Sequence, residues 1–277
     1  MILRKALQDG MARLRDAGIH GPERDARALL ADAVGLPPAR LSLEPDLELT
    51  AAQQARFDAA LTRRCHREPV SKIIGRRAFW GRDFQVSEAV LDPRPETETL
   101  IAEALKGPAP RRILDLGTGS GILPVTLLLE CAGATALATD VSPAALRVAA
   151  ANATTHGVAD RLTLQQADWF HGVIGQFDLI LSNPPYISET EMRDLAPEVL
   201  NHDPHLALTP GGDGLSPYVT IAEDAPRHLT PAGRLMVEIG WKQGPDVVAI
   251  FREAGLSHVQ ILADLDGRDR VVTATIA

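Results

Sequence analysis

From residue 111 onward, short apolar segments alternate with stretches of helical pattern, and this alternation limits the fold more than any other feature. The apolar segments are RRILDLG, ATALATD, LTLQQAD, FDLILSN and RLMVEIG. Between them, Ser142-Pro143 is typical of a helix start. Strands that alternate with helices favour a mainly parallel sheet covered on both faces. HVQILADLDGRDRVVTATI has no helix between its two strand-like runs, so we expect an antiparallel edge hairpin there.

The first third of the chain has the pattern of short amphipathic helices. Leu3, Leu7 and Leu14 fall on one helical face, and a second apolar stripe ends at Gly35. Thr50 begins a third helix, with Gln53 three residues on as a capping box. FWGRDFQVSEAVL, residues 79–91, alternates as in a strand or hairpin. We expect a helical domain over 1–77, a β-hairpin linker over 78–92 and an α/β domain over 93–277.

Composition and charge narrow the class of protein. The chain is 45% hydrophobic and 23% charged, as in soluble globular proteins, and its net charge is -8. That charge argues against a general affinity for nucleic acid or anionic membrane, since phosphate binding depends on Lys and Arg. Neither a signal peptide nor a membrane-spanning apolar run is visible. We expect a cytoplasmic protein that binds no membrane and no nucleic acid directly.

Basic residues are concentrated in residues 63–82, where Glu68 is the single acidic residue. This segment is either a solvated basic face or a docking surface for an acidic partner. Its basic members are Arg63, Arg64, Arg67, Lys72, Arg76, Arg77 and Arg82.

Metal-ligating side chains show no complete pattern. Cys65 and Cys131 form no metal or redox motif, and a chain of this size and class favours free thiols. His202 and His205 have a loose ligand-like spacing but lack an evident third ligand. We expect no metal site.

A glycine-rich turn directly follows ILDL, the first strand of the predicted sheet. Glycines let the backbone approach a ligand closely, and ligands of such sheets bind at the carboxyl ends of strands. The spacing is G-x-G-x-G, one residue shorter than the G-x-G-x-x-G of dinucleotide sites. Nineteen residues beyond the last glycine, Asp140 ends the second strand, a position from which a carboxylate reaches ribose hydroxyls. The predicted nucleoside site comprises Gly117, Thr118, Gly119, Ser120, Gly121 and Asp140.

Asp168 and Trp169 follow the third predicted strand at the same edge. A carboxylate or backbone group there can hold an exocyclic amine while the Trp169 ring covers an aromatic face. Alternatively, Trp169 simply packs against the edge of the sheet. The residues alone leave both interpretations open.

The fourth strand ends in a stiff corner, Asn183-Pro184-Pro185-Tyr186. The two prolines donate no backbone hydrogen bonds and restrict the residues before them. The Asn183 side-chain oxygen and the Pro184 carbonyl offer two acceptors near one point, and Tyr186 offers a flat stacking surface. This combination suits a planar NH2 group.

Such a corner also has a catalytic interpretation. Acceptors on both hydrogens of an amide or amino nitrogen favour the positive charge that develops as the nitrogen attacks. Alignment with an electrophilic carbon lowers most of the remaining barrier. A strong general base is not required, because the product nitrogen is very acidic. The corner thus predicts group transfer to a planar nitrogen rather than a simple strand terminator.

Together these motifs resemble the S-adenosylmethionine-dependent methyltransferases that modify planar nitrogens. EPVSKIIGRRAFWGRDFQV, LDPRPETE, ILDLGTGSG, DWF, SNPPYI, DPHLALTPGGDGL, EIG and GRDR occur in that order over about residues 50–277. They are similar to motifs of the PrmC or HemK family, the glutamine methyltransferases of peptide chain release factors. The resemblance implies an α/β, Rossmann-like class I methyltransferase domain with a mainly parallel seven-stranded sheet ending in an antiparallel hairpin. It also implies a small N-terminal helical domain that recognises the release factor, in a monomer.

The resemblance further implies a cofactor, S-adenosylmethionine, with S-adenosylhomocysteine as product. Trp169 would lie near its adenine. The other cofactor-binding residues would be Gly117, Thr118, Gly119, Ser120, Gly121, Asp140, Asp168 and Asn183.

The implied acceptor is the glutamine amide of the release factor's Gly-Gly-Gln loop. Asn183, Pro184 and Tyr186 would clasp it as the catalytic residues, with Pro185 fixing the turn. Substrate-binding residues would also include Arg94 and Glu96 of the PRPET corner.

The sequence departs from the family pattern at three points. Lys72 stands where an aromatic residue or His is more usual, and Asp203-Pro204 replaces Glu-Pro. Pro124 enters the first turn of the helix after Gly121, where proline is tolerated. None of these changes removes a predicted site residue.

Four alternative functions also deserve comparison with these motifs. The same chemistry could act on a glutamine of a large-subunit ribosomal protein, or on an exocyclic amine of DNA or RNA bases. Base modification needs a positively charged cleft, which only residues 63–82 could supply. The glycine spacing and the Asn183 corner disfavour a nicotinamide dehydrogenase, and intact motifs disfavour a non-catalytic interaction protein.

Overall fold

A computed structural model describes residues 1–276, and the chain divides into two compact units. The helical unit comprises Met1–Arg76 with Ala196–His202, and the sheet unit comprises Arg77–Leu195 with Asp203–Ala277. The segment 196–202 therefore belongs with the N-terminal helices. The sequence patterns gave no sign of this long-range addition.

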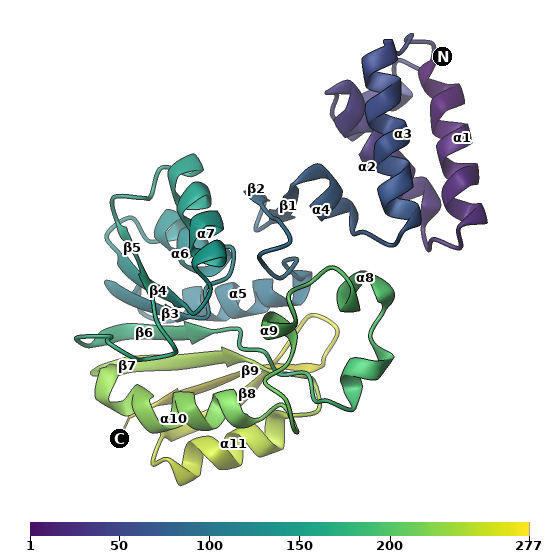
Figure 1. The fold of residues 1–277 in the computed structure, drawn as a ribbon. Coiled ribbons are helices and arrows are strands. Elements are labelled where there is room, and N and C mark those ends of the chain that lie inside the picture. Colours follow the sequence, from purple (N-terminus) through teal and green to yellow (C-terminus); the bar gives the residue numbers. More distant parts are fainter. Residues whose placement is uncertain (277) are drawn as a thin grey trace. The chain divides into compact units, whose positions relative to one another are not determined.

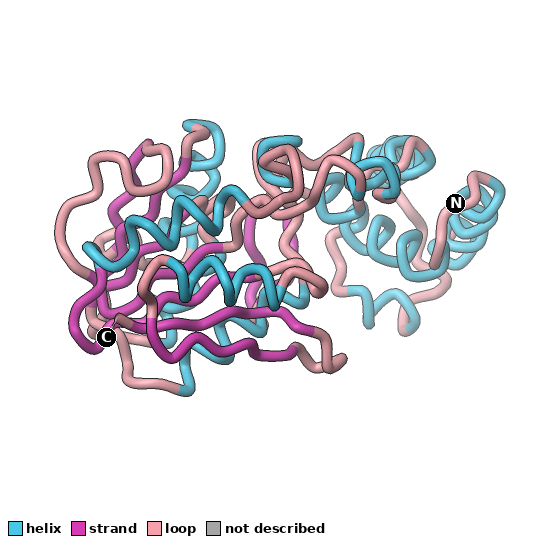
Figure 2. Tube along the Cα trace, turned by 90° about the horizontal axis from the view of Figure 1, so that it is seen from below, coloured by secondary structure: helices cyan, strands magenta, loops and turns pink. Residues whose placement is uncertain are grey.

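The helical unit is built from short helices and loops (Figures 1 and 2). Thr50 and Gln53 form the predicted capping box, and Gly35 ends the second helix in the left-handed conformation with φ 75°. Leu14, Leu30 and Phe57 meet in its buried core. Its helices are α1 (Leu3–Asp16), α2 (Pro22–Val34), η1 (Pro38–Ser42), α3 (Ala51–Cys65), α4 (Val70–Ile74) and α8 (Pro197–Leu200).

The predicted hairpin is present but shorter than the alternating pattern suggests. Its strands are β1 (Arg76–Phe79) and β2 (Arg82–Gln85), so strand structure over 86–91 was predicted wrongly. Val86 and Val90 instead bury their side chains against Ala145. Their alternation reflects packing onto a helix and not strand pairing. A short helix, η2 (Pro95–Thr97), follows.

A seven-stranded sheet forms the centre of the second unit, in the order β5-β4-β3-β6-β7-β9-β8. The first five strands in that order are parallel, and β9 pairs antiparallel with both β7 and β8. The predicted parallel sheet and C-terminal edge hairpin are therefore confirmed. The strands are β3 (Arg112–Leu116), β4 (Thr135–Asp140), β5 (Leu162–Gln166), β6 (Phe177–Ser182), β7 (Leu229–Glu238), β8 (Ser257–Ala263) and β9 (Asp269–Thr275).

Helices cover both faces of this sheet (Figure 1). Leu179 and Leu181 of β6 enter one apolar core, while Ile180 between them enters the other, because successive side chains of a strand point to opposite faces. One core includes α5 (Glu98–Lys106), α6 (Ile122–Glu130) and α7 (Pro143–Thr155), and the other includes α10 (Ser216–His228) and α11 (Gly244–Glu253). Two short helices, η3 (Glu191–Asp194) and α9 (His205–Leu208), lie in the loop between β6 and α10.

The strand register places the predicted site residues side by side. Leu116, the last residue of β3, pairs with Thr139 of β4 on one side and Ser182 of β6 on the other. Asp140 and Asn183 follow those two partners directly. The chain runs outward from β3 to β5 and then crosses back to β6. The carboxyl edge at this reversal is the ligand-binding position of doubly wound sheets.

Candidate active site

The glycine turn after β3 has two distinct functions. Gly117 and Gly119 have positive φ angles of 70° and 56°, and a Cβ on either would meet no atom within 4 Å. Both line a cavity at the carboxyl edge of the sheet, so their backbones are open to a ligand. A Cβ on Gly121 would instead lie 2.9 Å from the Cβ of Ala149 in α7. That glycine permits close packing between α6 and α7.

Asp140 holds this turn in place. Its Oδ2 accepts a hydrogen bond from the Gly119 N–H at 2.8 Å, and its Oδ1 accepts one from the Ser142 N–H at 2.8 Å. The carboxylate also lines the cavity. Each oxygen has further lone-pair capacity, so the carboxylate is available for ribose hydroxyls.

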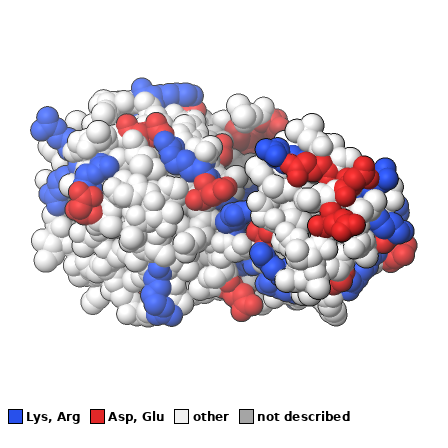
Figure 3. Space-filling view, turned by 90° about the horizontal axis from the view of Figure 1, so that it is seen from above, with Lys and Arg blue, Asp and Glu red and all other residues white. Residues whose placement is uncertain are grey.

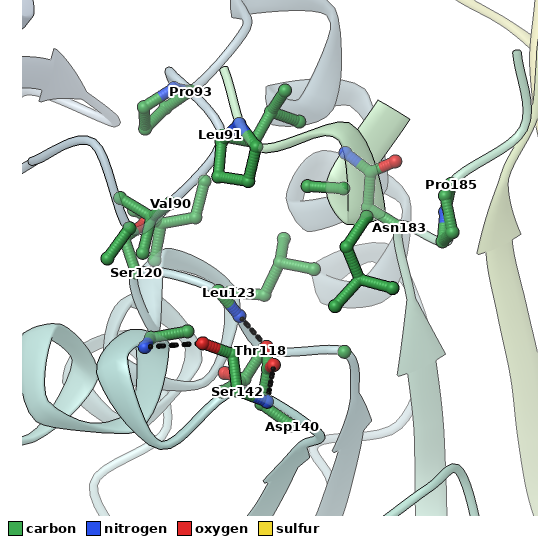
Figure 4. Close-up of a pocket in the computed structure, with 18 of the residues that line it drawn as sticks. Val90, Leu91, Pro93, Thr118, Ser120, Leu123, Asp140, Ser142, Asn183 and Pro185 are labelled. Carbon is green, nitrogen blue, oxygen red and sulfur yellow. Dashed lines mark hydrogen bonds between the residues drawn. The ribbon is translucent and has the colours of Figure 1, made fainter. Parts of the chain in front are cut away.

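The cavity combines this polar base with apolar walls (Figure 4). Val90, Leu91 and Pro93 of the segment after the hairpin contribute to the walls, together with Leu123 of α6 and Leu206 of α9. Thr118 and Ser120 also line it. Open glycine backbones, one carboxylate and apolar walls fit a nucleoside that carries a thioether-like arm. The residues present therefore fit S-adenosylmethionine.

Asp168 and Trp169 lie one residue beyond β5, whose carboxyl end is at the same edge as that of β4. Asp168 is exposed, and Trp169 is half-buried with φ 48°. The Trp169 side chain packs against the apolar core under α10 and α11. Neither residue is among those that line the cavity. Their contact with adenine remains a proposal.

The Asn183 corner adjoins the cavity, which Asn183 and Pro185 both line (Figure 4). The Asn183 Nδ2 donates to the Thr97 hydroxyl at 3.3 Å. Its Oδ1 has no hydrogen-bond partner within residues 1–276. Pro184 is buried beside it. The corner thus presents an unpaired side-chain acceptor at the cavity edge.

Tyr186 is fixed at both ends. Its hydroxyl lies 3.3 Å from Glu238 Oε1, and its backbone carbonyl accepts a hydrogen bond from Gln243 Nε2 at 3.0 Å. Burial is the main cause that raises the pKa of the Tyr186 hydroxyl, with the Glu238 charge second. The hydroxyl therefore stays protonated and the ring remains neutral.

Thr97, Glu238 and Gln243 were not predicted as site residues. Thr97 is in the PRPET corner and Glu238 is in the EIG motif, so each was close to a recognised signal. Burial raises the pKa of the Glu238 carboxyl to about 7, opposed first by the Thr97 hydroxyl and then by Arg270. A nearly neutral pKa on a buried carboxyl next to the corner is a feature of functional sites.

Arg94 and Glu96 have different positions. Arg94 lines the cavity, and its guanidinium pairs at 2.8 Å with Oδ2 of the buried Asp203. The other Asp203 oxygen accepts the Asp92 N–H at 3.2 Å. This pair connects the PRPET corner to the start of α9. Glu96 is exposed and outside the cavity lining, although its charge helps to raise the pKa of Glu238.

The basic segment over 63–82 is paired with carboxylates. Arg64 is buried and contacts Asp25 at 2.8 Å and Glu198 at 3.2 Å. Figure 3 shows charges of both signs interspersed on the face that it draws. This pairing favours an architectural role over the docking surface. The other pairs are Arg63–Glu68, Arg67–Glu198, Arg76–Asp32, Arg77–Asp92 and Arg82–Glu130, while Lys72 contacts the His202 carbonyl.

Residues 1–276 contain neither a metal-binding cluster nor a membrane-spanning helix. No group of three or more His, Cys, Asp and Glu side chains is placed to hold a metal ion. None of the helices in this range combines the length and apolarity needed to cross a membrane. Cys65 and Cys131 are free thiols.

A doubly wound sheet with a cavity of this lining at its reversal point is the architecture of an S-adenosylmethionine-dependent methyltransferase of Rossmann-like class I. Residues 5–75 match the PrmC N-terminal domain family, and residues 87–216 match the methyltransferase small domain family. A release factor glutamine methyltransferase of Cereibacter sphaeroides is 55% identical, covering 98% of this chain and 97% of its own. A release factor glutamine methyltransferase of Caulobacter vibrioides is 43% identical, covering 98% of this chain and 96% of its own. The chain belongs to the release factor glutamine methyltransferase family.

Solved structures show the same fold at low identity. A methyltransferase from Pyrococcus furiosus is 18% identical, with a TM-score of 0.55 and coverage of 79% of this chain and 98% of that one. The hMettl16 catalytic domain, in complex with MAT2A 3'UTR hairpin 1, is 14% identical, with a TM-score of 0.61 and coverage of 90% and 91%. These likenesses establish the class I methyltransferase architecture alone.

Proposed function

We propose that this enzyme methylates the side-chain amide nitrogen of the glutamine in the Gly-Gly-Gln motif of peptide chain release factors. The observation that carries the proposal is the unpaired Oδ1 of Asn183 at the cavity edge, beside the rigid Pro184 carbonyl. Curated relatives that share nearly the full chain are named for this substrate. The proposal includes a cytoplasmic monomer whose N-terminal helices recognise the release factor.

The cofactor would be held by the Gly117–Gly121 turn and by Asp140. When bound, S-adenosylmethionine supplies a methyl group bonded to a positively charged sulfur, which makes that carbon electrophilic. The Gly119 backbone is already fixed by Asp140 at 2.8 Å. Little reorganisation is therefore required on binding.

Asn183 and Pro184 would hold the acceptor amide. Their two oxygens accept its two N–H hydrogens, so positive charge developing on nitrogen is stabilised by groups already in place. Tyr186 supports the planar amide by stacking. The nitrogen then loses its proton to solvent, because methylation makes it strongly acidic. Glu238 does not need to act as a base.

Glutamine of a ribosomal protein and exocyclic amines of nucleic acids remain the competing acceptors. The carboxylate pairing of residues 63–82 does not favour a phosphate-binding surface. A panel of acceptors separates these alternatives. The purified enzyme is incubated with methyl-labelled S-adenosylmethionine and, separately, a release factor, a ribosomal protein fraction and duplex DNA.

We expect label on the release factor alone. Label confined to the ribosomal fraction or to DNA would overturn the proposed acceptor while retaining the Asn183 chemistry. The Asn183→Ala enzyme, run with every acceptor, controls for label that is transferred without the corner.

A further inference from the structure

The two ends of the Asn183 side chain are chemically opposite. The amide oxygen accepts hydrogen bonds, whereas the amide nitrogen only donates them. If the side chain were turned round, an NH2 group would face the NH2 group of the acceptor and oppose the positive charge developing there. Catalysis at this corner therefore depends on which way the amide is turned.

Thr97 contacts the nitrogen end of that amide. Its buried hydroxyl accepts the Asn183 Nδ2–H at 3.3 Å. A hydroxyl could equally donate its hydrogen to the amide oxygen, which would favour the reversed side chain. Something must direct the Thr97 hydrogen elsewhere.

Glu238 is placed to do this. Its side chain is 1% exposed; burial raises its pKa, and the Thr97 hydroxyl is the first of the groups that oppose this rise, as a donor to a carboxylate does. Glu238 Oε2 has no hydrogen-bond partner within residues 1–276. An ionised carboxylate only accepts hydrogen bonds. Directed toward that unpaired oxygen, the Thr97 hydrogen would leave the lone pairs of the hydroxyl facing Asn183.

The sheet register explains why these residues meet. Val237 of β7 pairs with Ser182 of β6, so Glu238 and Asn183 are the next residues on neighbouring strands. Burying a carboxyl with an unpaired oxygen is destabilising, and apolar packing alone gives no reason for it. This cost is consistent with a role in the site.

We propose that Thr97 and Glu238 are positioning residues that orient the Asn183 amide with its oxygen toward the acceptor nitrogen. The inference rests on the proposed function, because it concerns the same corner and the same planar acceptor. Neither residue touches the substrate in this account. Thr97 acts through Asn183, and Glu238 acts through Thr97 and through Tyr186, whose hydroxyl lies 3.3 Å from it.

The charge state of Glu238 gives the arrangement a pH dependence. The groups that face it are Arg270 of β9, Glu96 of η2, Tyr186 of the corner and, with its hydroxyl 3.0 Å from the Glu238 backbone carbonyl, Tyr218 of α10. With a pKa of about 7, the carboxyl is partly protonated near neutral pH. A protonated carboxyl can donate its own hydrogen to the Thr97 oxygen. The Thr97 hydrogen is then free to turn toward the Asn183 oxygen, which favours the reversed amide. Turnover should therefore rise as pH increases through this pKa.

The first test uses a matched pair of substitutions at position 97. Thr97→Val keeps the side-chain shape and removes the hydroxyl, whereas Thr97→Ser keeps the hydroxyl. We expect Thr97→Val to lower kcat by ~10-fold or more, with the cofactor Kd changed less than about 3-fold. Thr97→Ser should recover most of kcat. Thr126→Val is the control, because Thr126 is also buried but lies in α6 and its hydroxyl has no partner within residues 1–276.

The second test is the pH–rate profile of Glu238→Gln. We expect the wild-type rise near pH 7 to be absent in this variant, because its side chain cannot ionise. Unchanged kcat in Thr97→Val, failure of Thr97→Ser to recover it, or an identical pH profile in Glu238→Gln would each overturn the inference. A wild-type enzyme that labels no release factor would instead contradict the proposed function. Circular dichroism of each variant establishes that the fold is intact.

Discussion

The carboxylate of Asp140 and the backbone N–H of Gly119 are joined by a hydrogen bond of 2.8 Å. Through this contact, the end of β4 fixes the turn that follows β3. The second oxygen of Asp140 similarly holds Ser142, which caps α7. One side chain therefore shapes the cavity as well as lining it.

Asp140→Ala should weaken cofactor binding by ~30–100-fold, because two charge-assisted hydrogen bonds and a ligand contact are lost together. Asp140→Asn keeps one acceptor oxygen and should lose less, about 10-fold. Isothermal titration calorimetry with S-adenosylmethionine measures both. Wild-type affinity in a folded Asp140→Ala protein would contradict this assignment.

Asn183→Ala should lower kcat by ~100–1000-fold, the usual effect of removing one preorganised group that stabilises developing charge. Cofactor affinity should stay nearly intact, since the turn and Asp140 are unchanged. Single-turnover methyl transfer and calorimetry separate the two effects. Loss of all cofactor affinity with an intact fold would show that Asn183 mainly binds cofactor.

Gly214→Ala should disturb the Tyr186 backbone. A Cβ at Gly214 would lie 2.2 Å from the Tyr186 carbonyl oxygen, and its φ is 82°. Gly212→Ala is a matched control in the same loop, with φ 57° and no atom within 4 Å of the added Cβ. Both changes should cost about 1 kcal/mol of backbone strain, but only Gly214→Ala should also lower kcat, by ~10-fold or more. Equal kcat in the two variants would contradict the close-contact argument.

Asp115 should make stability depend on pH. Burial raises the pKa of its carboxyl to about 7, with the Thr118 hydroxyl acting in the opposite direction. Because the folded pKa exceeds the unfolded value of about 3.9, the stabilising contribution is complete below about pH 4. This contribution is lost as pH rises toward the folded pKa of about 7. The total loss of folding stability is about 4 kcal/mol.

Asp115→Asn removes this ionisation. Relative to wild type, its free energy of unfolding should be larger at pH 8 than at pH 5, by about 2–3 kcal/mol, which means that the variant gains relative stability as pH rises. Urea unfolding at both values, without cofactor, provides the measurement. If the free energies of unfolding of Asp115→Asn and wild type differ by the same amount at both pH values, the pKa of Asp115 is not raised.

The sequence patterns predicted the architecture well because they are local. Buried strands, caps and the glycine turn each depend on residues close together in the chain, as Thr50 and Gln53 show. Asp140 and Asn183 could be placed at one edge because the carboxyl ends of parallel strands coincide. This reasoning needed no side-chain detail.

Long-range partners could not be predicted in the same way. Thr97 and Glu238 are brought together only by the packing of η2 against the sheet and by the β6–β7 register. Arg64 looks like one member of an exposed basic segment, yet it is buried against Asp25. Trp169 packs on the apolar core, which the sequence offered only as one of two interpretations, and its contact with adenine stays a prediction. Such outcomes depend on tertiary neighbours that a linear pattern does not contain.

Mass spectrometry of a release factor, after incubation with the enzyme and S-adenosylmethionine, tests the central claim most directly. We predict that the peptide containing the Gly-Gly-Gln motif gains the mass of one methyl group, that fragmentation places it on the glutamine side chain, and that a factor with alanine in place of this glutamine gains nothing. A methyl group on any other residue, or on the alanine factor, would contradict the assignment of this corner to the glutamine amide.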